Sequence, residues 1–172
     1  MKKSGITRRI DELGRIVIPK EIRKNLKIRD SDELEISVRD GNIILNKYEI
    51  MEKDKTIETL LYTINKVLHK NILFTSKDSV IDYYLENKIE LNNKYLSNSV
   101  IKIIEHRKVI NSPMTKISIF DDVIEASYII SPIIINGDLL GSTILYSEKD
   151  NIDDLDISIM GFVNLFLEKY LE

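Results

Sequence analysis

Residues 1–48 carry too few apolar side chains to bury a stable core in a single copy. Their apolar residues occur singly or in short runs, and the whole chain of 172 residues contains no cysteine. Disulfide bridges and thiolate metal sites, which stabilise many small domains, are therefore excluded. The remaining way to bury enough apolar surface is association with a second copy. We therefore predict that residues 1–48 form an obligate homodimer.

The same end of the chain is strongly basic. Residues 1–29 contain ten Lys or Arg and three Asp or Glu, a balance of +7, so the other 143 residues carry −10 of the total charge of −3. Such asymmetry indicates a polyanionic partner that meets the basic end alone, because the acidic remainder would repel it. The alternative is that these are ordinary solvated charges on a small soluble domain.

Four short strands and one helical turn are expected in residues 1–48. Gly14 supplies the positive φ that a turn between two short strands needs, and Pro19 has the fixed φ of a first helical turn. Asp40-Gly41 lies between two apolar runs, which is a strong signal for a β-hairpin. The expected elements are strands over residues 6–10 and 15–18, a helix over 20–26, and a hairpin of residues 32–39 and 43–45.

Residues 56–172 are patterned for a second folded unit with mixed helices and strands. Apolar residues recur at helical spacing from Ile57 to Leu68, and Asn136-Gly137 joins two long apolar runs as a tight hairpin turn. The expected elements are helices over residues 57–68, 78–85, 92–107 and 153–170, strands over 72–75, 127–135 and 138–146, and an edge strand over 116–120.

These patterns predict an α+β protein of two domains. The boundaries are expected at residues 1–48, a polar linker at 49–55, and a larger domain at 56–172. Hydrophobic residues make up 43% and charged residues 31%, and no apolar run is long enough to span a bilayer. The N-terminus has no apolar segment behind its charges, so it does not resemble a secretory signal. We expect a cytoplasmic protein that does not contact membranes.

The segment from Gly5 to Arg23, GITRRIDELGRIVIPKEIR, closely resembles the signature of the AbrB-type swapped-hairpin family of DNA-binding domains. Residues 32–48 continue the similarity, so it covers nearly all of residues 1–48. The resemblance implies a dimeric β-barrel in which two chains exchange hairpins. It also implies that this domain binds duplex DNA, with AT-rich promoter regions as the expected target.

A second segment narrows the resemblance. Residues 128–141, YIISPIIINGDLLG, are similar to a hairpin of the SpoVT-like regulators, which join an AbrB-type domain to a C-terminal GAF domain. Ser131 replaces the glycine usual there. The resemblance implies a GAF-like α/β sandwich in residues 56–172, a homotetramer assembled through both domains, and regulation of late sporulation genes at the nucleoid of the forespore. The apolar helices near residues 57–68 and 155–170 could form the second interface as a bundle, or could simply cover their own sheet.

Five basic residues are the candidate DNA contacts. Arg8 and Arg9 end the first expected strand, Arg15 opens the second, and Arg23 and Lys24 lie on the short helix. A two-fold dimer would double the set symmetrically, as palindromic DNA requires. The resemblance assigns DNA contact to the same positions. No recognition-helix motif is visible, so phosphates and DNA shape are expected to carry much of the binding.

The sequence marks no particular ligand, cofactor or reaction. A GAF-like pocket bounded partly by Phe74, Tyr128 and Ile130 is conceivable, although these side chains would equally suit a core. His69 and His106 lie far apart and indicate no metal site. Neither a phosphate-binding glycine loop nor a catalytic serine motif is present, so we expect no enzymatic activity and no cofactor.

Two other functions remain open. The swapped-hairpin domain also occurs in AbrB/MazE-type antitoxins, whose C-terminal segment is a disordered tail that wraps a toxin, but residues 56–172 are patterned for a packed core. The chain could also be a transition-state regulator that is not dedicated to sporulation. Whether it activates or represses its genes, and whether a small-molecule signal modulates it, is not visible in the sequence.

Overall fold

The computed structural model describes residues 5–26, 28, 30, 34–47, 54–87, 90–91 and 95–172. The chain divides into two compact units, residues 1–48 and 49–172, which are described separately below. Most of the linker expected at residues 49–55 lies outside the described residues.

The first unit contains one short helix and one β-hairpin. Helix α1 (Lys20–Asn25) begins after Pro19. Strands β1 (Leu34–Arg39) and β2 (Asn42–Lys47) pair antiparallel across a two-residue turn. Asp40 and Gly41 both have positive φ, 52° and 74°, which matches the twist that paired strands require. The predictions of a helix after Pro19 and of an Asp-Gly hairpin are confirmed.

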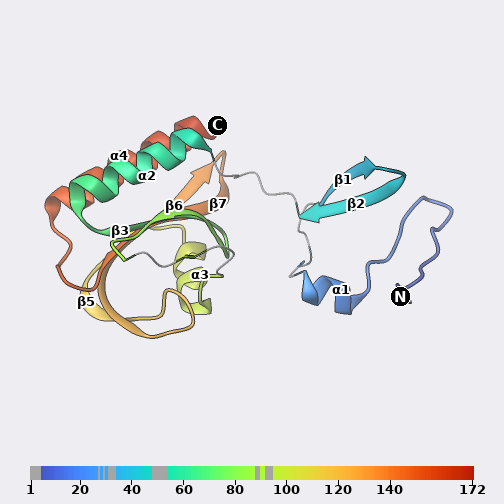
Figure 1. Ribbon diagram of the computed structural model, residues 1–172, viewed down its shortest axis with the longest axis horizontal. Coiled ribbons are helices and arrows are strands. Elements are labelled where there is room, and N and C mark those ends of the chain that lie inside the picture. Colours follow the sequence, from blue (N-terminus) through green and yellow to red (C-terminus); the bar gives the residue numbers. More distant parts are fainter. Residues whose placement is uncertain are drawn as a thin grey trace. The chain divides into compact units, whose positions relative to one another are not determined.

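The two strands expected over residues 6–10 and 15–18 do not form in the described structure. These residues make an open loop (Figure 1), closed by a turn in which Gly14 N donates to Asp11 O at 2.9 Å and Asp11 N donates to Arg15 O at 3.1 Å. A strand requires a neighbouring strand to satisfy its backbone groups, and among the described residues the two arms of the loop have none. The prediction of strands here is wrong for the chain by itself.

The hairpin of the first unit has one apolar face, and nothing described covers it. Cross-strand pairing places Ile36 opposite Leu45 and Val38 opposite Ile43 on the same face. All four side chains are exposed, Ile36 at 69%, Leu45 at 37%, Val38 at 74% and Ile43 at 70%. No side chain described between residues 5 and 46 is classed as buried. The first unit therefore has the amphipathic pattern of a folded domain without a core of its own.

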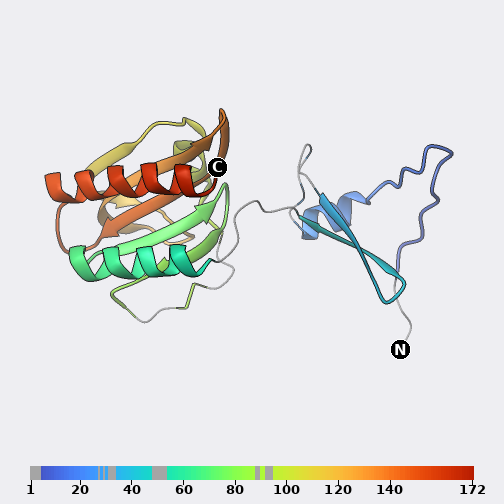
Figure 2. The ribbon, with the colours of Figure 1, turned by 90° about the horizontal axis from the view of Figure 1, so that it is seen from above.

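The second unit is a five-stranded antiparallel sheet between helices. Its strands lie in the order β4-β3-β7-β6-β5. Figures 1 and 2 show α2 and α4 side by side on one face and α3 on the other. The elements are α2 (Lys55–Leu68), β3 (Asn71–Ser76), β4 (Val80–Tyr84), α3 (Asn98–Glu105), β5 (Ile110–Ile117), β6 (Ile124–Ile135), β7 (Asp138–Ser147) and α4 (Asp154–Tyr170).

The central hairpin of β6 and β7 organises this sheet. Asn136 and Gly137 form its turn with φ of 52° and 86°, as the dipeptide predicts. Apolar side chains alternate between the two faces of these strands, so two cores result. Ile129, Ile133 and Leu145 pack under α2 and α4, whereas Ile130, Ile144 and Tyr146 pack under α3.

Three expectations for the second unit need correction. Residues 78–85 were expected to be helical, but residues 80–84 form β4, because a short apolar run rich in β-branched and aromatic residues suits a strand paired with β3. The helix expected over 92–107 is α3, which begins only after Ser97, whose side chain accepts from Val100 N; residues 92–94 lie outside the described residues. The edge strand expected at 116–120 is β5, which starts at Ile110.

A buried ion pair ties the end of α2 to the start of α4. Lys70 Nζ lies 3.1 Å from Asp156 Oδ2, and the two residues are only 8% and 1% exposed. The same carboxylate oxygen accepts from Asp153 N at 2.9 Å, while Asp153 Oδ1 accepts from Asp156 N at 2.9 Å, which completes a capping box. One carboxylate thus starts α4 and holds the neighbouring α2–β3 connection.

Replacing Asp156 with alanine should strongly destabilise the second unit. The change leaves the Lys70 ammonium buried without its partner, and breaking a buried pair in this way costs about 3–5 kcal/mol. Urea unfolding followed by circular dichroism measures the effect. Lys169→Ala on α4 is the matched control, because it breaks an exposed pair with Glu172, just beyond the end of the helix, and should cost less than about 1 kcal/mol. Equal losses in the two variants would contradict this role of Asp156.

Candidate nucleic-acid interface

The five candidate DNA contacts all lie in the first unit. Arg8 and Arg9 are on the open loop, Arg15 follows its turn, and Arg23 and Lys24 are on α1. Arg23 is half-buried, and the other four side chains are exposed. Exposed Arg and Lys on one small unit can contact phosphates, and Arg can also bind guanine in the major groove.

The turn between the two arms of the loop holds Arg15 tightly. Asp11 Oδ1 accepts from Leu13 N at 3.0 Å and from Arg15 N at 2.8 Å. Asp11 Oδ2 accepts from Arg15 Nε at 2.7 Å. These hydrogen bonds lower the pKa of the Asp11 carboxyl. The bond from the Arg15 backbone N–H has the largest effect, and the bond from the Arg15 guanidinium has the next largest. Asp11 therefore stays ionised across the neutral range and keeps its hold on Arg15.

The helix cation Arg23 is also held by an acid of its own chain. Arg23 Nη1 donates to Asp30 Oδ1 at 2.8 Å, and Arg23 Nε is buried with no described hydrogen-bond partner. On the loop, Arg8 Nη1 donates to Thr7 O at 3.0 Å. The cations were evident in the sequence, whereas their acidic partners Asp11 and Asp30 were not predicted. The spacing of Asp11 and Arg15, four residues apart around a glycine turn, was the available signal.

The residues proposed for a sensory pocket do not bound one pocket. Phe74 is fully buried in the core under α2 and α4. Ile130 is fully buried in the core under α3, and Tyr128 packs beside that second core. Because successive residues of a strand point to opposite faces, the sheet itself separates Phe74 from the other two. The expectation that these three side chains share a pocket is wrong in this geometry.

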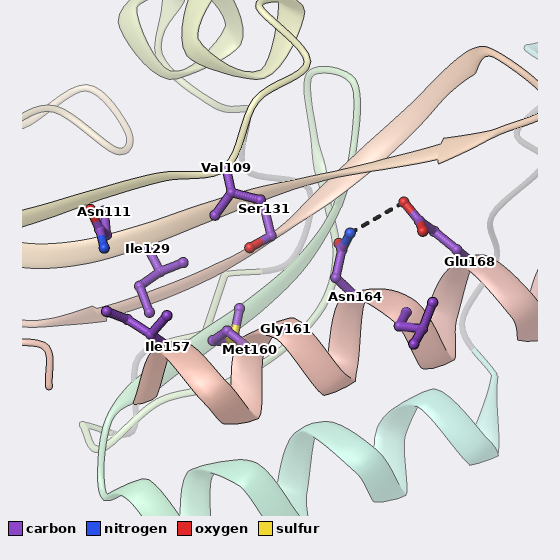
Figure 3. A pocket seen from close by; sticks show the side chains of 10 residues that line it. Val109, Asn111, Ile129, Ser131, Ile157, Met160, Gly161, Asn164 and Glu168 are labelled. Atoms are coloured by element: carbon purple, nitrogen blue, oxygen red, sulfur yellow. Dashed lines mark hydrogen bonds between the residues drawn. The ribbon is translucent and has the colours of Figure 1, made fainter. Parts of the chain in front are cut away.

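A cavity of about 350 Å³ lies elsewhere in the second unit, between α4 and the strands β5 and β6. Figure 3 shows side chains from both strands facing the helix across it. Its lining is mainly apolar, with a few polar groups, as in many ligand pockets. The lining residues are Val109, Asn111, Ile129, Ser131, Ile157, Met160, Gly161, Asn164, Leu165 and Glu168.

Two residues of α4, Asn164 and Glu168, place hydrogen-bond acceptors in the lining of this cavity. Asn164 Nδ2 donates to Glu168 Oε1 at 3.2 Å (Figure 3), and the same oxygen accepts from Ile134 N at 3.3 Å. Because a carboxylate only accepts, this contact fixes the orientation of the Asn164 amide. Its Oδ1 is buried and has no described hydrogen-bond partner. Gly161 lies on the same stretch of α4, and a Cβ added there would meet nothing within 4 Å.

Within the described part of the chain, neither histidine lies in a group that would hold a metal ion. His69 ends α2 in the left-handed region with φ of 51°, and His106 ends α3. Among the residues described, no three His, Asp or Glu side chains are arranged to bind a metal. None of the described helices is both long and apolar enough to cross a membrane.

Two families match this chain, and their matches meet near the boundary between the two units, with an overlap over residues 48–53. Residues 48–172 match the family described as stage V sporulation protein T C-terminal, transcription factor. Residues 7–53 match the family of the antidote-toxin recognition protein MazE, a bacterial antitoxin.

Individual relatives agree with both matches. Stage V sporulation protein T of Bacillus subtilis is 33% identical over 177 aligned residues, which span 100% of this chain and 99% of the relative. The transition state regulatory protein AbrB of the same organism is 57% identical over 49 residues, 28% of this chain and 51% of the relative. Antitoxin VapB40 of Mycobacterium tuberculosis is 56% identical over 34 residues, 20% of this chain and 42% of the relative.

The second unit also resembles a solved structure. The cofactor-binding GAF domain of the nutrient sensor CodY from Clostridium difficile superposes with a TM-score of 0.55 at 15% identity, covering 70% of this chain and 86% of that domain. This likeness shows the GAF-like fold. Together with an AbrB-like first unit and similarity over the full length, it completes the assignment: the chain belongs to the stage V sporulation protein T family of DNA-binding transcription regulators.

Proposed function

We propose that this DNA-binding transcription regulator acts at AT-rich promoters of late sporulation genes, at the nucleoid of the forespore. The balance of +7 in residues 1–29, on a chain whose remaining 143 residues carry −10, is the observation that carries the proposal. A duplex attracts the first unit and repels the second, so contact is confined to one end of each protomer. The sporulation role rests on the relative from Bacillus subtilis.

The proposed DNA contacts are Arg8, Arg9, Arg15, Arg23 and Lys24. Two copies related by a two-fold axis would present ten such cations, spaced as a palindromic site requires. If each protomer places three or four of them on phosphates, the logarithm of affinity falls with the logarithm of salt concentration with a slope of roughly −5 to −7. Arginine can add contacts to guanine or to a narrow minor groove.

The uncovered apolar face of the first unit supports a dimer built through this domain. Exposed Ile36, Val38 and Ile43 would cost free energy in water, and a second copy offers an identical apolar face to cover them. We propose that the partner also supplies the missing neighbours of residues 6–10 and 15–18. The dimer interface and the DNA-binding surface would then belong to one domain that the two chains form together.

A second interface would convert dimers into a tetramer. Helices α2 and α4 leave Val67, Leu155 and Phe162 exposed, at 57%, 58% and 64%. Apolar side chains at such positions suit an intermolecular helix bundle. We therefore propose a homotetramer assembled through both units.

An input at the GAF-like unit is the second part of the proposal, and the cavity beside α4 is its proposed site. The polar lining includes the Glu168 carboxylate and the unpaired Asn164 Oδ1 as acceptors, together with Asn111 and Ser131, and none of the lining residues in this described region is basic. Such a lining complements a small molecule with an apolar body and an N–H donor. Gly161 supports this, because a helix-interior glycine without close neighbours costs stability and keeps the cavity open.

The antitoxin alternative is disfavoured by the second unit. A toxin-wrapping tail would be disordered alone, whereas the described residues from 54 to 172 bury two apolar cores. The match of residues 7–53 to the antitoxin family concerns the first unit alone. Limited proteolysis that left no stable fragment of the second unit would restore this alternative.

Replacing Arg15 or Arg23 with alanine should weaken DNA binding without unfolding the protein. Each change removes two cations per dimer, so the salt slope should fall by roughly 2 if both lie on phosphates. Fluorescence anisotropy with an AT-rich promoter duplex at several salt concentrations measures both quantities. Lys66→Ala on α2 removes an exposed cation from the other unit and serves as the control. Folded Arg variants that bind like the wild type would refute the proposed surface.

Replacing Val38 with aspartate should dissociate the first unit. The carboxylate would be buried without a partner in the proposed interface, and several kcal/mol is expected to be lost. Sedimentation should show tetramers falling to dimers joined through α2 and α4, and Phe162→Asp should instead leave dimers joined through the first unit. Ser37→Asp, on the opposite hairpin face, is the control. Unchanged assembly in Val38→Asp would contradict the proposed dimer.

The wild type should be stabilised by phenethylamine and not by 3-phenylpropionate, which has a similar body and the opposite charge. Binding to the folded state raises the melting temperature. Gly161→Leu should fill the cavity and remove the effect. Gly161→Ala should keep it and should itself stabilise α4 by about 0.5–1 kcal/mol. Equal shifts with the two compounds, or a shift that survives in Gly161→Leu, would remove this cavity from the proposal.

A further inference from the structure

Both oxygens of the Asp11 carboxylate are used within the loop of the first unit. Oδ1 accepts from the backbone N–H groups of Leu13 and Arg15, and Oδ2 accepts from Arg15 Nε. One carboxylate thus shapes the turn and also fixes the side chain of the residue after it. A charged acceptor makes such hydrogen bonds roughly twice as strong as neutral ones.

The contact determines which part of Arg15 remains available. Its Nε is engaged, its side chain is 72% exposed, and within the described residues no partner contacts its two Nη groups. A guanidinium held at Nε presents its Nη edge in a restricted orientation. That edge carries the paired N–H donors that match guanine O6 and N7, or two phosphate oxygens.

We propose that Asp11 is a positioning residue that determines DNA specificity by holding Arg15 for one oriented contact. This inference rests on the proposed function, because it assumes that Arg15 touches DNA. The proposed role affects affinity and specificity in opposite directions, which distinguishes Asp11 from an ordinary surface acid. A carboxylate near a polyanion weakens binding to every sequence, so Asp11 lowers affinity in general and raises the preference for the correct site.

The neighbouring residue Glu12 provides a matched control. Glu12 is exposed and has the same charge, and no described hydrogen bond or ion pair joins it to Arg15. Asp11→Asn and Glu12→Gln therefore remove equal charge from adjacent positions. In Asp11→Asn the amide oxygen can still accept from the Leu13 and Arg15 backbone N–H groups, so the turn is kept. The amide nitrogen, however, cannot accept from Arg15 Nε.

The experiment uses the full chain and two DNA duplexes. One duplex is selected by the wild type from a random pool, and the other is a scrambled sequence of the same composition. Asp11→Asn should reduce the ratio of the two dissociation constants at least about tenfold, because each dimer would lose the orientation of two arginine contacts, while the salt slope stays unchanged because every cation remains. Glu12→Gln should keep the ratio within about twofold and tighten binding to both duplexes. In an Arg15→Ala background, Asp11→Asn should have no further effect on the ratio.

The possible outcomes distinguish a failure of the proposed DNA-binding surface from a failure of the positioning role of Asp11. If Arg15→Ala binds DNA like the wild type, the proposed surface fails. If Arg15→Ala weakens binding but Asp11→Asn behaves like Glu12→Gln, only the positioning role is overturned. A measurement without DNA covers misfolding: the Arg15 Nε–H signal in a ¹⁵N spectrum of the wild type should exchange slowly with water, and this protection should disappear in Asp11→Asn and persist in Glu12→Gln. Rapid exchange in the wild type would also overturn the inference.

Discussion

The exposed apolar face of the hairpin in residues 34–47 is the constraint on which the account depends. Ile36, Val38, Ile43 and Leu45 lie on that face, and no described residue of the first unit covers them. A single copy therefore gains little from hydrophobic burial, whereas ordering its backbone still costs conformational entropy. A second copy would resolve this imbalance by covering the apolar face. It would also double the set of arginines and set their spacing, so in the proposed function the dimer interface underlies folding, assembly and DNA recognition alike.

The second unit illustrates the opposite case. Its sheet buries apolar side chains on both faces, and the Lys70–Asp156 pair fixes the connection between its two long helices. This unit needs no partner to form a core. In the proposed function, the exposed apolar residues on α2 and α4 would serve assembly and the cavity beside α4 would receive a signal. A regulator built this way would separate a stable sensory unit from a DNA-binding unit that depends on assembly.

The sequence predicted the parts of the fold that local chemistry controls. Asp40-Gly41 and Asn136-Gly137 specify their hairpins, Pro19 starts α1, and the helical spacing from Ile57 to Leu68 specifies α2. It failed at residues 80–84, where a short apolar run fits a helix or a strand and pairing with β3 decides. The prediction that Phe74 and Ile130 share a pocket also failed. The two residues lie on strands that are distant in sequence, and only the folded sheet shows that their side chains point to opposite faces. The cations of the candidate site were visible as a charge cluster, but the geometry of Asp11 around Arg15 required the folded turn.

The most direct test of the central claim asks whether residues 6–18 contact the hairpin of their own chain or that of a partner. Isotope-filtered NMR on a mixture of differently labelled full-length chains distinguishes the two. The account predicts intermolecular contacts between methyl groups of Ile10 or Ile16 on one protomer and those of Val38 or Ile43 on the other. If every such contact is intramolecular, or the hairpin methyl groups remain in water, the first unit is not an interlocked dimer and the account is contradicted.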